Sequence, residues 1–425
     1  MHRLACHQKW PDDLRSGIDY IPNGSAAFCG WAYTEPERDL NPQHLRATAP
    51  VLSRAGRGDG MNRRDFLWSA GLVSASFAIP RPARLLALSL AAPGWRTFEV
   101  TTRVELLKFS GATRLWLPAA CVCTTPFQKT LSNHFSAPDG TAELVESKAD
   151  GLGIIAAKYS AGVRPVLTLT SRIATKDYAV DFSAPGSPAA ERAELDHFLR
   201  STRLLPIDGI VKSTATEITR GARTDVEKAR AVYDWIVCNT YRNPKARGCG
   251  IGDIRWMLES GDLGGKCADL NGLFVGLARA AGLPARDVFG IRVAKSGLGY
   301  KSLGASSENI TKAQHCRAEV YLGGYGWVPV DPADVRKVAL EEPPGNRALD
   351  DDMVKRARAR LFGSWEMNWI AYNFANDVAL PGSSGPPVGF LMYPQAETAD
   401  GRLDGLDPDN FRYEITAREI SPAIL

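Results

Sequence analysis

The run from Gly264 to Pro284 constrains the fold most, because it passes from a turn into a helix and out again within one short segment. Two glycines open the run, and apolar residues then recur at spacings of three, four and seven, which places them on one face of a helix. Gly282 and Pro284 mark the end, since glycine favours the left-handed position after a helix and proline cannot continue one. The apolar positions are Leu270, Leu273, Phe274, Leu277 and Ala281.

Three strand-like runs follow the predicted helix, at residues 286–294, 314–322 and 325–331. A helix followed by strands in one segment is typical of an α+β fold. Upstream, Thr224 and Glu227 have the spacing of a capping box at the start of another predicted helix. We therefore predict an α+β core over residues 190–340.

Cys267 falls in the predicted first turn of the helix. Unpaired N–H groups and the positive end of the helix dipole stabilise a thiolate there, and the same N–H groups can stabilise an oxyanion. Lys266 would add to this effect, and Asp269 would oppose it slightly. Gly264 and Gly265 let the chain turn sharply and leave room for a substrate. The placement suits an activated nucleophile, whereas a purely structural cysteine would behave as a small buried apolar residue.

A cysteine nucleophile needs a histidine within hydrogen-bonding reach and an acceptor that orients the histidine. His315 begins one strand-like run, and Asp331 ends the next. A three-residue turn at 323–325 would pair the apolar faces of these strands and leave His315 and Asp331 as diagonal neighbours on the other face. A two-residue turn would put them on opposite faces. With the longer turn, Cys267, His315 and Asp331 are predicted to form a catalytic triad.

Three sequence blocks around these residues resemble the transglutaminase-like superfamily of papain-type cysteine enzymes. They read "GGKCADLNGLFVGLARAAGLPARDVFGIRV", "HCRAEVYL" and "GYGWVPVDPADVRK", and the resemblance covers roughly residues 224–337. It implies a transglutaminase-like (papain-like) fold, with Cys267 as the nucleophile, His315 as the base and Asp331 as the residue that orients the histidine.

One departure from the family pattern is Arg317, which stands where members often carry a tryptophan. The departure leaves the triad complete and bears on the choice of substrate. The resemblance also implies a side-chain oxyanion donor upstream of the cysteine, and Tyr241 and Trp256 are both candidates.

The implied chemistry is acyl transfer through a thioester on Cys267. Water as the acceptor gives hydrolysis and an amine gives a cross-link, and the resemblance in bacteria favours a peptidase or amidase. The alternative is a binding or scaffold protein that keeps the fold without catalysis and has a Cys267 thiol of ordinary reactivity. No cofactor or metal is expected, because His315 and Cys316 are neighbours on a strand and point to opposite faces.

The rest of the chain is divided by its patterns. Residues 93–185 alternate as strands do and predict an N-terminal β-sandwich-like domain, in which Cys121 and Cys123 would share one face of a strand as core or surface thiols. Beyond Asp331 we expect loops and short strands, with residues 341–425 as a C-terminal elaboration packed on the core.

Residues 61–92 resemble a twin-arginine export signal, because an Arg-Arg pair precedes Phe66, Leu67 and a short apolar stretch. The stretch is shorter than the roughly 20 residues that a spanning helix needs. We therefore expect a periplasmic or otherwise exported protein with no stable membrane span after signal removal. Residues 1–60 are interpreted as a mis-set start or a disordered lead.

Charge and cysteine content limit the partners. A formal net charge of +4 over 425 residues does not indicate nucleic-acid binding, and the basic run at 355–360 is interpreted as a solvated helix face. A twin-arginine substrate folds in a reducing cytoplasm, so its cysteines need not form disulfides. The expected partner is a protein or peptide substrate.

Overall fold

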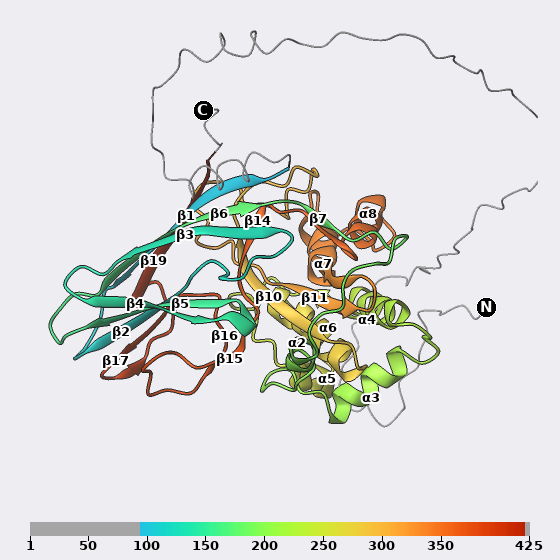
Figure 1. Ribbon diagram of the computed structural model, residues 1–425, viewed down its shortest axis with the longest axis horizontal. Helices are drawn as coiled ribbons and strands as arrows, with labels where there is room; N and C mark the ends of the chain where they lie inside the picture. Colours follow the sequence, from blue (N-terminus) through green and yellow to red (C-terminus); the bar gives the residue numbers. More distant parts are fainter. Residues whose placement is uncertain (1–93, 421–425) are drawn as a thin grey trace, which may run out of the picture. The chain divides into compact units, whose positions relative to one another are not determined.

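The computed structural model describes residues 94–420, which all lie in a unit spanning residues 88–425 (Figure 1). The predicted export signal at 61–92 and the interpreted lead at 1–60 lie outside the described residues. Within the described range, no helix has the length and apolar character needed to cross a bilayer.

Two sheets form the β-rich part (Figure 1). The strands of the first are β1 (Arg96–Leu106), β3 (Gln128–Ser136), β6 (Val166–Thr175) and β19 (Phe411–Glu419), in the order β19-β1-β6-β3. The strands of the second are β2 (Thr113–Pro118), β4 (Thr141–Ser147), β5 (Leu152–Tyr159), β17 (Gln395–Thr398) and β18 (Gly401–Arg402), in the order β18-β17-β2-β5-β4. Apolar side chains of both sheets meet in one buried cluster, as the sandwich prediction requires.

The end of the chain completes both sheets. β19 pairs antiparallel with β1 along its length, and β17 pairs with β2. Part of the predicted C-terminal elaboration is therefore built into the β-rich part. Another part extends the core, because β14 (Trp369–Asn373) pairs with β10 (Ala285–Arg292). The division of the chain at 93–185, 190–340 and 341–425 stays a prediction.

The α+β core contains a four-stranded sheet covered by helices. Its sheet has the order β12-β11-β10-β14, with β11 (Arg317–Leu322) and β12 (Gly326–Val330). Its helices are α3 (Gly209–Ile218), α4 (Asp225–Asn239), α5 (Ile254–Ser260), α6 (Cys267–Ala280), α7 (Pro332–Glu341) and α8 (Asp352–Arg360). Every residue of α6 is buried, so this helix passes through the centre of the core.

Two local predictions about the core are confirmed. Thr224 and Glu227 form the capping box of α4, because the threonine hydroxyl accepts from the Glu227 N–H at 3.2 Å and the glutamate accepts from the Thr224 N–H at 3.0 Å. The three-residue turn joins β11 to β12, with Val320 opposite Val328. The apolar faces of the two strands are therefore paired in the predicted register.

Two other local predictions are wrong. Cys121 and Cys123 do not lie on a strand, because β2 ends at Pro118 and both cysteines are in the loop that follows. A helix, α7, begins directly after Asp331 and was not predicted, and the loops and short strands expected beyond Asp331 come after it. Asp331 caps this helix and Pro332 is its first residue, a combination that favours helix initiation.

The remaining helices and strands of the described residues are short. They are the 3₁₀ turn η2 (Lys148–Asp150), α2 (Arg192–His197), β7 (Tyr178–Ala179), β8 (Tyr241–Arg242), β9 (Gly264–Gly265), β13 (Ser364–Trp365), β15 (Asn376–Val378) and β16 (Val388–Phe390). β8 and β9 pair in parallel immediately before α6, so this pair sets where the helix begins.

Candidate active site

The start of α6 is held in a tightly packed turn. Cys267 is its first residue and is only 3% exposed. The Asn243 N–H donates to the Gly265 carbonyl at 2.8 Å, which continues the β8–β9 pairing. A Cβ on Gly265 would lie 2.4 Å from the Cβ of Asp269, so the turn has no room for a larger residue. The space beside the glycines is occupied by the side chains of Tyr241 and Asp269, so the room predicted for a substrate stays a prediction.

Asp269 anchors a neighbouring loop to the start of α6. Its carboxylate accepts from the N–H groups of Ile251, Gly252 and Lys266, each at 2.9 Å. Burial raises the pKa of the Asp269 carboxyl against these three bonds, and the Cys267 charge adds to the rise. The charge of Asp269 therefore opposes the Cys267 thiolate, as expected, but the role of Asp269 as an anchor of the loop was not predicted.

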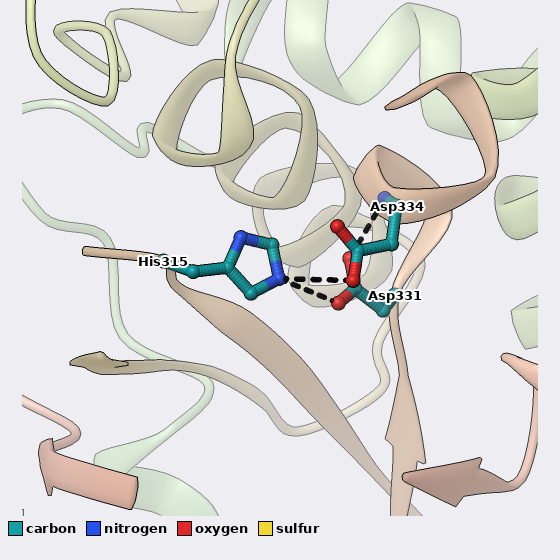
Figure 2. Close-up of side chains that lie close together, drawn as sticks. All are labelled: His315, Asp331 and Asp334. Atoms are coloured by element: carbon teal, nitrogen blue, oxygen red, sulfur yellow. Dashed lines mark hydrogen bonds and ion pairs between the residues drawn. The ribbon is translucent and has the colours of Figure 1, made fainter. Parts of the chain in front are cut away.

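His315 and Asp331 meet as predicted. The His315 Nε2 lies 2.8 Å from Asp331 Oδ2, and both side chains are buried (Figure 2). The histidine backbone is fixed on both sides: its N–H donates to the Gly290 carbonyl at 3.0 Å, and the Trp369 indole donates to its carbonyl at 2.8 Å. With Nε2 engaged by the carboxylate, Nδ1 is the ring nitrogen left for Cys267.

Asn271 ties the helix of the nucleophile to the helix that Asp331 caps. It lies one turn after Cys267 on α6, and its amide donates to Asp331 Oδ1 at 3.1 Å. Its carbonyl oxygen accepts from the Ala333 N–H at 3.2 Å. The positions of the nucleophile and the carboxylate are therefore coupled through one buried side chain, which the sequence analysis did not identify.

A second carboxylate, Asp334, stands at the same histidine nitrogen (Figure 2). Its Oδ2 lies 3.4 Å from His315 Nε2, and its N–H donates to Asp331 Oδ1 at 3.0 Å. Arg292 binds both Asp334 oxygens, at 2.6 and 2.8 Å. Asp334 was not predicted because α7 was not predicted. The Asp-Pro step that caps α7 is the sequence signal that could have identified this helix.

Arg317 is buried behind the triad. Its guanidinium lies over the rings of Trp365 and Trp369, at 5.3 and 4.7 Å from their centroids. Its Nε is 3.7 Å from Asp331 Oδ2, and its Nη1 donates to the Glu366 carbonyl at 3.0 Å. Burial lowers the pKa of Arg317 to about 10, against the Asp331 charge. The departure from the family pattern thus acts on the aspartate of the triad.

Two further thiols flank Cys267. Cys249 lies on the loop that Asp269 anchors, and its carbonyl accepts from the Ala268 N–H at 2.9 Å. Its Sγ lies 3.3 Å from the Gln314 carbonyl, and it also forms a hydrogen bond with the Cys267 thiol. Cys316 is a second hydrogen-bond partner of Cys267. The sequence analysis interpreted Cys316 as a packed residue, which its complete burial fits, and did not identify Cys249.

These neighbours favour a thiolate at Cys267. Hydrogen bonds from Cys249 and Cys316 outweigh burial and, with the hydrogen bond and charge of His315, hold the pKa of Cys267 well below its usual range. The pKa of Cys249 is raised well above the usual thiol value by its bond to Cys267 and by burial. The pKa directions in the cluster therefore favour a thiolate at Cys267 and protonated thiols at Cys249 and Cys316.

The histidine is held in the protonated form. Burial and the Arg292 charge oppose protonation, but Asp334 and Asp331 outweigh them and raise the pKa of His315 to about 10. A thiolate at Cys267 and an imidazolium at His315 can therefore coexist near neutral pH. Such a pair supplies both a nucleophile and a proton donor.

A pocket of about 320 Å³ reaches this cluster from the surface. Cys249, a hydrogen-bond partner of Cys267, forms part of its lining. Tyr393, another lining residue, has its hydroxyl bonded to Cys249, and burial raises the pKa of that hydroxyl above its usual range. Apolar lining comes from Leu204, Phe390, Leu403 and Leu406.

The two predicted oxyanion donors are held elsewhere. The Tyr241 hydroxyl donates to Asp262 at 2.8 Å, and its ring packs over Gly264. Trp256, on α5, is 55% exposed. In the part of the chain that the structure describes, neither side chain is a hydrogen-bond partner of Cys267. The role proposed for them stays a prediction.

His315, Asp331 and Asp334 also have the geometry that a metal site would need. Their ligand atoms lie within 4.8 Å of one another, and among the described residues they form the one such group. Arg292 already binds both oxygens of Asp334, and Arg317 stands at Asp331, so the two carboxylates are neutralised by the protein. We assign no metal to these residues, and the expectation of none stays a prediction.

Comparisons with known proteins identify the family of the chain. The family model of the transglutaminase-like superfamily matches residues 212–332. An uncharacterized protein of Haemophilus influenzae is 34% identical over 342 residues, which are 76% of this chain and 91% of that protein.

Two solved structures are also similar. A provisionally assigned cysteine protease from Cytophaga hutchinsonii is 16% identical, with a TM-score of 0.44 over 76% of this chain and 98% of that one. The periplasmic domain of TgpA from Pseudomonas aeruginosa is 15% identical, with a TM-score of 0.32 over 60% of this chain and 92% of that one.

Proposed function

The chain belongs to the transglutaminase-like superfamily, and on that premise we propose that it is a cysteine-dependent amidase or peptidase with Cys267 as its nucleophile. His315 is the proton donor and acceptor, and Asp331 orients it. The observation that carries the proposal is the buried His315 ring, which bonds to Asp331 at 2.8 Å through Nε2 and whose hydrogen bond and charge lower the pKa of the Cys267 thiol.

The reaction balances with these residues alone. The Cys267 thiolate attacks the carbonyl carbon of an amide, and the C–N bond breaks as the His315 imidazolium gives its proton to the leaving amine. A thioester remains on Cys267. Water then attacks the thioester carbon and transfers a proton to His315, which releases the acid and restores the ion pair. An amine in place of water would give transamidation.

The Cys267 N–H is the backbone donor that we assign to the developing oxyanion. It lies at the first residue of α6, where the helix dipole is positive. The next amide, that of Ala268, already donates to the Cys249 carbonyl.

The pocket beside Cys249 is the proposed site for the acyl group of a protein or peptide substrate. A protein or peptide substrate also fits an exported enzyme, and the proposed location is the periplasm or another exported compartment. That part of the proposal rests on the signal-like residues 61–92.

The function is tested with a panel of fluorogenic peptide amides and the variants Cys267→Ala and His315→Ala. We expect amine release by the parent protein and a thioester adduct on Cys267 by mass spectrometry. Adding an excess of a primary amine distinguishes hydrolysis from transamidation by the mass of the product. A parent protein that forms no adduct, and whose Cys267 has ordinary thiol reactivity, would instead support the non-catalytic scaffold.

A further inference from the structure

We propose that Asp334 is a positioning residue that offsets the charge of Arg292 and keeps His315 protonated opposite Cys267. The inference rests on the proposed function only for its catalytic meaning, since the protonation of His315 can be measured without a substrate. It extends the triad to a second carboxylate at the same ring nitrogen (Figure 2).

The two carboxylates at Nε2 are held by different parts of the core. Asp331, at 2.8 Å, is bound through its other oxygen by Asn271 of α6 and by the first turn of α7. Asp334, at 3.4 Å, is bound by Arg292 of β10. Two carboxylates whose side chains are held by different partners thus face one N–H group, which leaves Nδ1 free to pair with the thiolate.

Arg292 and the His315 imidazolium together keep a buried carboxylate charged at this position. A lone carboxylate that is 1% exposed would take up a proton, because burial disfavours the charged form. Arg292 binds both of its oxygens and is itself fixed by a bond of 2.6 Å to the Leu303 carbonyl. Burial is therefore outweighed by Arg292 and His315, and the pKa of Asp334 is well below its usual range.

The charges around His315 balance only if Asp334 is counted. The charged groups that face the histidine are Cys267 of α6, Arg292 of β10, Arg317 of β11, and Asp331 and Asp334 at the start of α7. With the ion pair formed, three cations oppose three anions. Removing the Asp334 charge leaves the buried cluster with a net positive charge. His315 can restore neutrality by releasing its proton.

Other titratable groups act on the thiol. Cys249 and Cys316 are protonated donors to Cys267. Asp287 of β10 also faces the thiols, and burial raises its pKa to about 6. None of these three residues is a partner of Arg292. The effect of a charge change at Asp334 can therefore be measured separately from their effects on the thiol.

The test is a charge cycle made of Arg292→Gln, Asp334→Asn and the double variant, with the parent protein as the reference. Titration of the His315 ring is followed by NMR of histidine-labelled protein, and His315→Ala identifies its signal. Asp334→Asn should lower the pKa of His315 from about 10 toward its ordinary 6.5. Arg292→Gln should not lower it, because the arginine opposes protonation of His315 and the imidazolium still holds Asp334 charged.

The double variant keeps the test decisive if the Asp334→Asn protein fails to fold because its Arg292 is unpaired. The step from Arg292→Gln to the double variant removes only the Asp334 charge, and both proteins lack the unpaired arginine. We expect the pKa of His315 to fall across that step, and the alkaline limit of amide hydrolysis to fall with it. A purely structural role would lower stability without moving either one.

An unchanged His315 titration across that step would overturn the proposal and leave Asp334 as a partner of Arg292 alone. The result is independent of the proposed function. A parent protein without a reactive Cys267 would contradict the amidase proposal, while the histidine titration would still decide the role of Asp334.

Discussion

Two regions of the molecule bring a pair of cysteines together, and they differ in what surrounds the pair. At the start of α6, Cys267 has a lowered thiol pKa and its neighbour Cys249 a raised one. In the loop after β2, a hydrogen bond from Cys121 lowers the pKa of Cys123 to about 7, and the pKa of Cys121 is raised. By thiol acidity alone, both regions would qualify as reactive.

The surroundings separate them. Beside Cys267 stands a histidine that can give a proton to a leaving group, whereas the cation near Cys123 is Arg286. That arginine bonds to Glu319 at 2.8 Å and lies over the Trp327 ring at 4.0 Å. An arginine stays protonated and cannot serve as a general acid. The comparison teaches that a proton donor, and not a low thiol pKa, marks the candidate active site.

The largest expected effect is on the rate of amide hydrolysis, and it distinguishes the two cysteine pairs. Cys267→Ala should lower the rate of amide hydrolysis by about 10⁴-fold or more, because the thioester cannot form. Cys123→Ala should leave the rate unchanged, since its pair lies in the loop after β2. Both rates are measured as amine release from peptide amides. Equal losses in the two variants would contradict the distinction.

A second comparison concerns how deeply charged groups are buried in the core and in the β-rich part. Asp331→Ala removes a completely buried carboxylate from His315 and Arg317 and should cost about 3–5 kcal/mol in the free energy of unfolding. Glu99→Ala, in β1, removes pairs with Arg172 and Arg418, both more than half exposed, and should cost about 1 kcal/mol or less. Urea denaturation measures both, and similar costs would show that the triad region is not specially buried.

Matched glycines test the anchored loop. Gly250 and Gly162 both have positive φ, of 96° and 83°, so alanine should cost about 1–2 kcal/mol at either position. Only at Gly250 would the new Cβ collide with Asp269, at 1.8 Å from its Oδ2, whereas Gly162 faces open space. Gly250→Ala should therefore also slow alkylation of Cys267. If Gly162→Ala slowed it equally, the Asp269 anchor would have no special role.

The smallest expected effect is a shift within each thiol pair. Cys249→Ala should raise the pKa of Cys267, because its largest stabilising hydrogen bond is lost. Cys121→Ala should raise the pKa of Cys123 from about 7 toward the ordinary value of about 8.5. Alkylation rates against pH, resolved by peptide mass spectrometry, report both. Each substitution should leave the other pair unchanged, and a cross-effect would show that the regions are coupled.

Much of the core was predictable because its patterns are local. The glycine turn, the apolar face of α6 and the capping box of Thr224 each depend on residues within one helix. The contact of His315 with Asp331 was predictable because one turn length decides which strand faces meet.

The rest of the site could not be read from such patterns. Cys249 and Asn271 reach the triad by hydrogen bonds between residues far apart in the sequence, and Arg292 is one of two arginines in β10, with no local pattern that marks it as the partner of Asp334. The cysteines after β2 were misassigned because their spacing of two residues would place them on one face of a strand, whereas the strand ends at Pro118. Long-range partners of this kind leave no periodic signal.

The central claim is the ion pair of Cys267 with His315, and its most direct test is the rate of Cys267 alkylation by iodoacetamide as a function of pH. The rate must be resolved for this one cysteine, because Cys123 should also react near neutral pH. The account predicts a Cys267 pKa well below the ordinary value of about 8.5, and a rise in His315→Ala. A pKa near that ordinary value, unchanged in His315→Ala, would contradict it.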